Sequence, residues 1–142
     1  MSVERNKAMD RRYVAEVLNG GNLASIDEIM APAYVGHVPG FPPSDREGDK
    51  QLIAMFHHAF PDLRFTLEDQ IAEGDRVVHR LSVVGTHRGE FMGIPPTHRR
   101  VSVTGVNINR FENGQIIEAW GFMDMLGLLQ QLGAIPEPPP RP

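Results

Sequence analysis

The spacing of the apolar residues changes once along this chain of 142 residues, at Pro61, and that change restricts the folds open to it. Before Pro61 the apolar side chains recur every three or four positions, as in amphipathic helices, and after it they alternate, as in strands. A block of helices followed by a block of strands favours an α+β fold, in which the helices pack on one face of an antiparallel sheet.

Turn residues divide each block into elements. Gly20-Gly21 ends the first helix and Pro32 the second, and residues 34–47, with three prolines and two glycines, are expected to form a loop. Asn113-Gly114 is the strongest hairpin signal in the chain. The predicted helices span 2–19, 23–31, 48–60 and 126–132, and the predicted strands span 65–71, 77–86, 101–111 and 115–124.

The composition excludes several classes of function. The chain has no cysteine, which excludes a thiolate nucleophile, a disulfide scaffold and a cysteine zinc site. A net charge of −4 argues against nucleic-acid binding. No apolar run approaches 18 residues, so we expect no membrane span, no signal sequence and a cytoplasmic protein. We expect one domain over residues 1–135 and a disordered Pro-rich tail over 136–142.

The hairpin at Asn113-Gly114 predicts which side chains share a face of the sheet. A two-residue turn fixes a register in which Asn107 lies opposite Trp120. One face of the hairpin is then apolar apart from Arg110, and the other mixes aromatic and polar groups, as ligand pockets do. A three-residue loop with a bulge would shift this register by one. The mixed face consists of Gly105, Asn107, Asn109, Glu118, Trp120, Phe122 and Asp124.

Three motifs in the second half of the chain carry a family resemblance. They are G-T-H-x-G-E-F-x-G-I-P-P-T at 85–97, R-F-x-N-G-Q-I at 110–116 and W-x-x-x-D-x-x-G-L-L-Q-Q-L-G at 120–133. The chain resembles the SnoaL-like polyketide cyclases, a family within the NTF2-like (ketosteroid isomerase-like) superfamily. The resemblance implies an NTF2-like α+β barrel, or cone, whose curved sheet wraps around an apolar cavity closed by the N-terminal helices. It also implies a homo-oligomer joined through the outer face of the sheet.

The same resemblance implies a chemistry. In the characterised cyclases one carboxylate removes a proton from a carbon between carbonyl groups, and an intramolecular aldol condensation closes a ring without a cofactor or a metal. Asp124 occupies the matching position, and a carboxylate desolvated beside Trp120 and Phe122 is a usable base. The expected ligand is a small hydrophobic, polyketide-like carbonyl compound. The alternative for Asp124 is a helix N-cap.

Three positions depart from the family pattern. Asn107 stands where the cyclases have His, Gly105 stands where they have Gln, and the cyclases have Asn near the position of Gly36. An amide donates a hydrogen bond but cannot take up a proton near pH 7. Two alternatives therefore stay open: a protein that binds a hydrophobic molecule without catalysis, and an enzyme resembling epoxide hydrolases. The latter needs two carboxylates with an arginine between them, and Arg110 is expected to face outward.

The histidines supply further candidates. His37 lies in the loop expected to form the cavity rim, and His87 precedes a loop that can act as a lid. His79 shares the parity of the inward-facing residues of its strand. His57-His58 are helix neighbours that point about 100° apart, so they cannot hold one metal ion, and we expect no metal site. The predicted catalytic residue is Asp124, and the predicted substrate-binding residues are Asn107, His37, His87, Trp120, Phe122 and Glu118.

Overall fold

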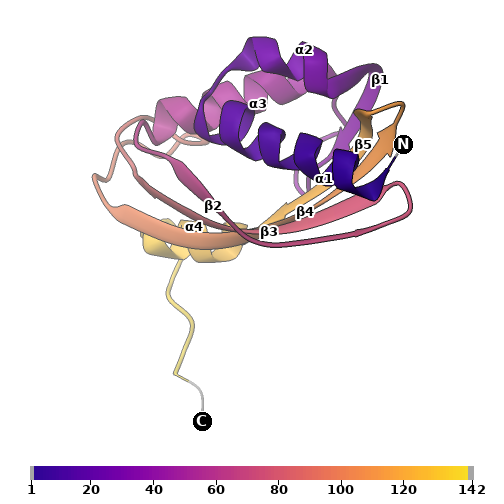
Figure 1. Ribbon diagram of the computed structural model, residues 1–142. Coiled ribbons are helices and arrows are strands. Elements are labelled where there is room, and N and C mark those ends of the chain that lie inside the picture. Colours follow the sequence, from indigo (N-terminus) through magenta and orange to yellow (C-terminus); the bar gives the residue numbers. More distant parts are fainter. Residues whose placement is uncertain (1, 141–142) are drawn as a thin grey trace.

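A curved five-stranded sheet lies beneath a layer of helices in this computed structural model, which describes residues 2–140 (Figure 1). The strands lie in the order β1-β5-β4-β3-β2, with β1 parallel to β5 and the other neighbouring pairs antiparallel. The predicted α+β class, with N-terminal helices covering a curved sheet, is confirmed. The strands are β1 (Met30–His37), β2 (Arg64–Glu73), β3 (Arg76–Thr86), β4 (Arg100–Glu112) and β5 (Gln115–Met123).

Polar side chains cap the first turns of the longer helices. Ser2 Oγ accepts a hydrogen bond of 3.1 Å from Arg5 N at the start of α1, and Asp45 Oδ1 accepts one of 2.9 Å from Gly48 N at the start of α3. α1 continues without a break into a π-helical segment, η1. The helical segments are α1 (Val3–Arg12), η1 (Tyr13–Asn19), η2 (Leu23–Ser25), α2 (Ile26–Ile29), α3 (Arg46–Ala59) and α4 (Met125–Gln131).

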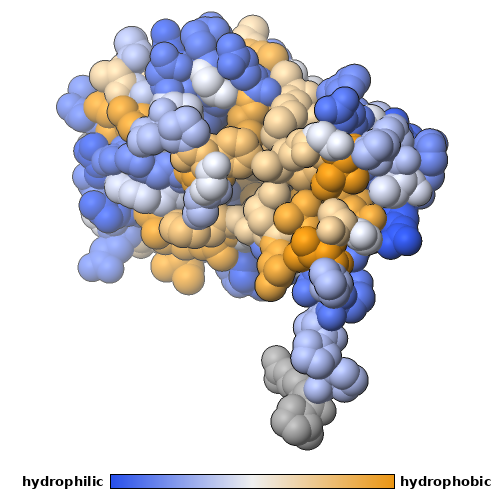
Figure 2. All heavy atoms as spheres, turned by 180° about the vertical axis from the view of Figure 1, so that it is seen from behind, coloured by the Kyte–Doolittle hydropathy of each residue, from blue (hydrophilic) through white to orange (hydrophobic). Residues whose placement is uncertain are grey.

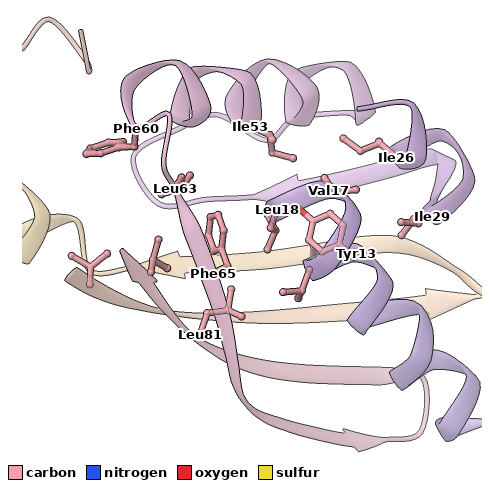
Figure 3. Close-up of a cluster of buried hydrophobic side chains, with 14 of the residues drawn as sticks. Tyr13, Val17, Leu18, Ile26, Ile29, Ile53, Phe60, Leu63, Phe65 and Leu81 are labelled. Carbon is pink, nitrogen blue, oxygen red and sulfur yellow. The ribbon is translucent and has the colours of Figure 1, made fainter. Parts of the chain in front are cut away.

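The hydrophobic core lies between the inner face of the sheet and the helices above it (Figure 3). Val17 on η1 and Ile53 on α3 are buried there, and along β3 every second side chain, such as Leu81, faces them. Burying one large apolar side chain of this kind contributes about 1.5–3 kcal/mol to stability. The same inner face forms the floor of the cavity described below.

The sequence prediction missed β1. The second helix was expected to reach residue 31 and a loop to cover 34–47, but the helix ends at Ile29 and β1 follows at once. Pro32 is compatible with a strand here because β1 is an edge strand and its register shifts between Met30 and Val35. Pairing with β5 is a long-range contact, which the local pattern of prolines and glycines does not report.

The hairpin register beyond the turn differs from the prediction. The two-residue turn is confirmed, since Asn113 and Gly114 both have positive φ, at 52° and 79°. The expected register is wrong farther along, because a bulge leaves Ile117 as an extra residue on β5. Asn107 therefore lies opposite Gly121, and Trp120 lies opposite Ile108 on the outer face of the sheet.

The C-terminal segment leaves the sheet beyond α4. Residues 136–140 carry no regular structure, are exposed and extend away from the rest of the chain (Figure 1). The last two residues of the predicted tail, 141–142, lie outside the described residues. Among residues 2–140, no helix combines the length and apolar composition needed to cross a membrane.

Candidate functional site

A cavity of about 420 Å³ opens between the helices and the inner face of the sheet. Its walls are mainly apolar: Ile53 and Phe56 from α3 face Leu81 and Val83 from β3. Residues 37–41 line the same cavity, in agreement with the prediction that this segment forms the cavity rim. Volume and lining are both in the range of sites that enclose a small organic molecule.

Asp49 places a buried carboxyl group in the wall of this cavity. Its side chain is only 5% exposed, and its oxygens lie 3.5 Å from the hydroxyls of Tyr13 and Tyr34, one on each side. Contacts of that length are weak, so they compensate little for the loss of water. Burial therefore raises the pKa of Asp49 to about 6, against the smaller opposing effect of the two hydroxyls.

Local structure explains how the two tyrosines reach Asp49. Tyr13 opens the π-helical segment η1, and such segments occur often at functional sites. Tyr34 points inward from β1 over Gly36, where a Cβ atom would lie 2.5 Å from the Tyr34 hydroxyl. Glycine at position 36 is therefore required for the tyrosine to take this position.

Asp124 does not lie in the apolar surroundings expected for it. It is exposed at the junction of β5 and α4, where its Oδ1 accepts a hydrogen bond of 2.9 Å from Gly127 N. The first N–H groups of a helix have no partner within the helix, and Asp124 satisfies one of them. Its predicted desolvation is thus wrong, because the bulge in β5 turns Trp120 to the outer face. Its catalytic role stays a prediction, since Met123 and Met125 beside it line the cavity.

Glu118 belongs to a cluster on the outer face of the sheet. Its carboxylate lies 2.8 Å from His37 Nε2 and 3.1 Å from Arg110 Nη2, and the His37 ring stacks on Trp120 at 5.6 Å. Hydrogen bonds to His37 and Arg110 lower the pKa of Glu118. Glu118 and Trp120 therefore face away from the cavity, although His37 and Phe122 reach its edge.

Of two further predicted binding residues, Asn107 lies at the cavity and His87 lies deeper than expected. Asn107 lines the cavity from β4, as predicted. His87 is fully buried below the loop that follows β3, where its Nδ1 accepts a hydrogen bond of 3.1 Å from Thr97 N and its ring packs on Phe60. Desolvation lowers the pKa of His87. His87 therefore belongs to the buried core and does not line the cavity.

A second buried carboxylate, Asp10, anchors a polar network under α1. Its oxygens accept hydrogen bonds from His79 Nδ1 at 2.8 Å, Asn109 Nδ2 at 2.7 Å and Gln70 Nε2 at 2.8 Å. His79 faces the helices, as its parity predicts, but bonds to Asp10 instead of lining the cavity. The network ties α1 to β2, β3 and β4.

Sequence reasoning missed Asp49 and His57, which both line the cavity from α3. A signal for Asp49 was present, because it stands four residues before Ile53 and seven before Phe56, on the apolar stripe of its helix. A carboxylate on such a stripe is buried when the helix docks. Within residues 2–140, no group of three or more His, Asp or Glu side chains is arranged to hold a metal ion.

Fold and cavity together define a class of protein: an α+β barrel with a mainly apolar cavity and a buried carboxyl group in its wall. The sequence model of the SnoaL-like polyketide cyclases matches residues 8–132, and the chain belongs to that family. The resemblance seen in the sequence motifs is thereby confirmed.

Curated relatives and solved structures agree with this assignment. The chain is 30% identical over 129 residues to nogalonic acid methyl ester cyclase of Streptomyces nogalater, covering 84% of this chain and 92% of the relative. It is 29% identical over 137 residues to aklanonic acid methyl ester cyclase DnrD of Streptomyces peucetius, covering 92% and 91%.

Two solved structures share the fold closely. AclR from Streptomyces galilaeus, a proposed hydroxylase, has a TM-score of 0.87 and 35% identity, covering 97% of this chain and 87% of AclR. IdmH from Streptomyces antibioticus, a proposed polyketide cyclase, has a TM-score of 0.81 and 34% identity, covering 90% and 98%. These likenesses support a polyketide-cyclase-like function for the chain.

Proposed function

We propose that this protein closes a ring in a small hydrophobic carbonyl compound of the polyketide type by acid/base catalysis, without a cofactor, and that Asp49 is the base. Asp49 is the only carboxylate among the described residues that line the cavity. A base works best when its pKa lies near the pH of the reaction, and the pKa of Asp49 is raised to about 6. This position of Asp49 is the observation that carries the proposal.

The proposed reaction is an intramolecular aldol condensation. The carboxylate of Asp49 takes a proton from a carbon between two carbonyl groups, and the electron pair of the broken C–H bond forms an enolate. The enolate carbon attacks a second carbonyl carbon of the same molecule, which gives a C–C bond and an alkoxide. The proton then moves from Asp49 to the alkoxide and the base is restored.

The residues around Asp49 favour this chemistry. The hydroxyls of Tyr13 and Tyr34 are donors beside the carboxyl and can stabilise the negative oxygen of the enolate. The apolar walls exclude water, so these electrostatic interactions are stronger than they would be in solution. Asn107 supplies a further amide donor on the opposite wall.

The experiment compares two isosteric variants, Asp49→Asn and Asp124→Asn. The substrates are nogalonic acid methyl ester and aklanonic acid methyl ester, after which the relatives are named. We expect Asp49→Asn to lower kcat by about 10²–10⁴-fold, the usual contribution of a positioned base, and Asp124→Asn to change it by less than about threefold. In the wild type, kcat should rise with pH and level off above about pH 6.

Other outcomes assign the chemistry differently. A large loss in Asp124→Asn with none in Asp49→Asn would restore Asp124 as the base. Tight binding of both esters without turnover by the wild type would make the protein a carrier of hydrophobic molecules. Epoxide hydrolysis has the least support, because Arg110 pairs with Glu118 on the face opposite the cavity.

We also propose that the outer face of the sheet joins two copies of the chain. Val106 and Phe122 are neighbours on this face and are 37% and 51% exposed, and Leu126 of α4 is 62% exposed. Figure 2 shows hydrophobic residues gathered above the C-terminal tail, on the side seen from behind. Exposed apolar side chains in such a patch are typical of protein interfaces.

A further inference from the structure

His57 lines the cavity and carries a ring nitrogen that no described residue uses as a hydrogen-bond acceptor. It lines the cavity from the last turn of α3, where its ring is half-buried. Nε2 lies 2.7 Å from the backbone carbonyl oxygen of Leu18. Because a carbonyl oxygen only accepts hydrogen bonds, Nε2 must carry the proton, and in the neutral ring Nδ1 then keeps its lone pair.

No described residue donates a hydrogen bond to Nδ1 of His57. The ring is nevertheless held in place from two sides. Leu18, at the end of the π-helical segment η1, fixes Nε2, and Gly21 lies below the ring face. A Cβ atom at Gly21 would lie 3.8 Å from Cε1 and 3.9 Å from each ring nitrogen, so the ring lies flat over this glycine. His57 is therefore an oriented acceptor.

His57 and Asp49 stand at two ends of the same cavity. They lie eight residues apart on α3, which corresponds to about 12 Å along the helix axis. The walls between them are apolar, with Ile53 and Phe56 on the same helix. Three fused six-membered rings have about this length, and a ligand that fills the space reaches both polar groups.

We propose that His57 is a substrate-recognition residue, whose Nδ1 accepts a hydrogen bond from a hydroxyl group on the end of the substrate remote from the reacting carbonyl. The inference rests on the proposed function for the position of the reacting carbonyl at Asp49. It narrows the substrate to a fused-ring or linear carbonyl compound with a free hydroxyl at its far end. A ligand without that hydroxyl desolvates Nδ1 with nothing in return, and sites of this kind discriminate strongly against such analogues.

The test uses two probes that differ by one oxygen, 2-hydroxymethylanthraquinone and 2-methylanthraquinone, in calorimetric titrations at pH 8. The wild type should bind the hydroxymethyl compound about tenfold more tightly. In His57→Phe the preference should vanish or reverse, because the methyl compound is the more hydrophobic of the two. The matched control is His58→Phe, an exposed neighbour on the same helix that does not line the cavity, and it should keep the preference.

A second measurement needs no variant. In ¹⁵N spectra of the wild type, the Nδ1 resonance of His57 should shift when 2-hydroxymethylanthraquinone is added and stay unchanged with 2-methylanthraquinone. Equal affinity of the two probes for the wild type, or a preference that survives in a folded His57→Phe, overturns the inference.

The two proposals fail independently. Asp49→Asn should lose turnover and keep the preference for the hydroxymethyl probe, since the two side chains contact different ends of the ligand. A wild type that prefers this probe but closes no ring refutes the proposed function alone. A wild type that closes rings in an Asp49-dependent way but does not distinguish the probes refutes the role of His57 alone.

Discussion

Replacing Asp49 by asparagine should make the folded protein more stable at neutral pH. The ordinary pKa of an aspartate is 3.8, and burial raises that of Asp49 to about 6. The fold therefore prefers the protonated carboxyl and is destabilised when the group ionises. Asparagine has nearly the same shape and cannot ionise, so it removes this penalty while keeping a polar group beside Tyr13 and Tyr34.

The size of the effect follows from the two pKa values. Each pKa unit corresponds to about 1.4 kcal/mol, so a rise from 3.8 to about 6 corresponds to about 3 kcal/mol. Below pH 3.8 the carboxyl is protonated in both the folded and the unfolded chain, and the penalty is absent. Between pH 3.8 and 6 the folded chain binds more protons than the unfolded chain, so stability falls as the pH rises. Above pH 6 the full penalty applies.

Urea denaturation at several pH values between 4.5 and 8 measures this. Asp49→Asn should exceed the wild type by about 2–3 kcal/mol at pH 8, and by much less at pH 4.5. Asp124→Asn is the control: its side chain is exposed and caps α4, so we expect a pH-independent loss of at most about 1 kcal/mol. An Asp49→Asn protein that is less stable than the wild type at pH 8, or a difference that does not vary with pH, would refute the reasoning.

Two further predictions concern buried polar groups outside the cavity. Desolvation lowers the pKa of His87, so the unfolded chain binds a proton at this residue before the folded chain does as the pH falls below about 6.5. The wild type should therefore lose stability in that range. His87→Gln should flatten this pH dependence in urea titrations between pH 7 and 5. Asp10→Ala leaves the donors of His79 and Asn109 unpaired in the core and should lower the free energy of unfolding by about 3–5 kcal/mol. The control is Asp45→Ala, which removes an exposed helix cap and should lower the free energy of unfolding by about 1 kcal/mol. A loss in Asp10→Ala no larger than that in Asp45→Ala would show that the network contributes little.

Local signals in the sequence were enough for most of the fold. The turn at Asn113-Gly114 is a property of a few neighbouring residues and is confirmed, and the change of periodicity at Pro61 correctly separates α3 from β2. The sequence did not predict β1, because its strand conformation depends on pairing with β5, some 80 residues away. The tertiary contact outweighs the turn propensity of the prolines and glycines around it.

The site was less predictable than the fold. Alternation along β5 correctly grouped Trp120 with Phe122, but a bulge cannot be read from alternation. Trp120 was therefore assigned to the wrong face, and Phe122 reaches only the edge of the cavity. Asp124 was favoured because it matches a family motif, and the cap it forms on α4 was only the alternative. Asp49 carries no motif at all, and its importance becomes visible only when α3 is docked against Tyr13 and Tyr34.

The bulge at Ile117 decides whether this barrel is hollow. With the extra residue, β5 turns Ala119 and Gly121 toward the interior, and both line the cavity. If Ile117 were instead paired with Arg110, without a bulge, the rest of β5 would shift by one position and the rings of Trp120 and Phe122 would face inward. The two aromatic side chains would then fill the cavity and leave no space for a ligand. Leaving one residue of β5 unpaired thus keeps the two large rings out of the cavity.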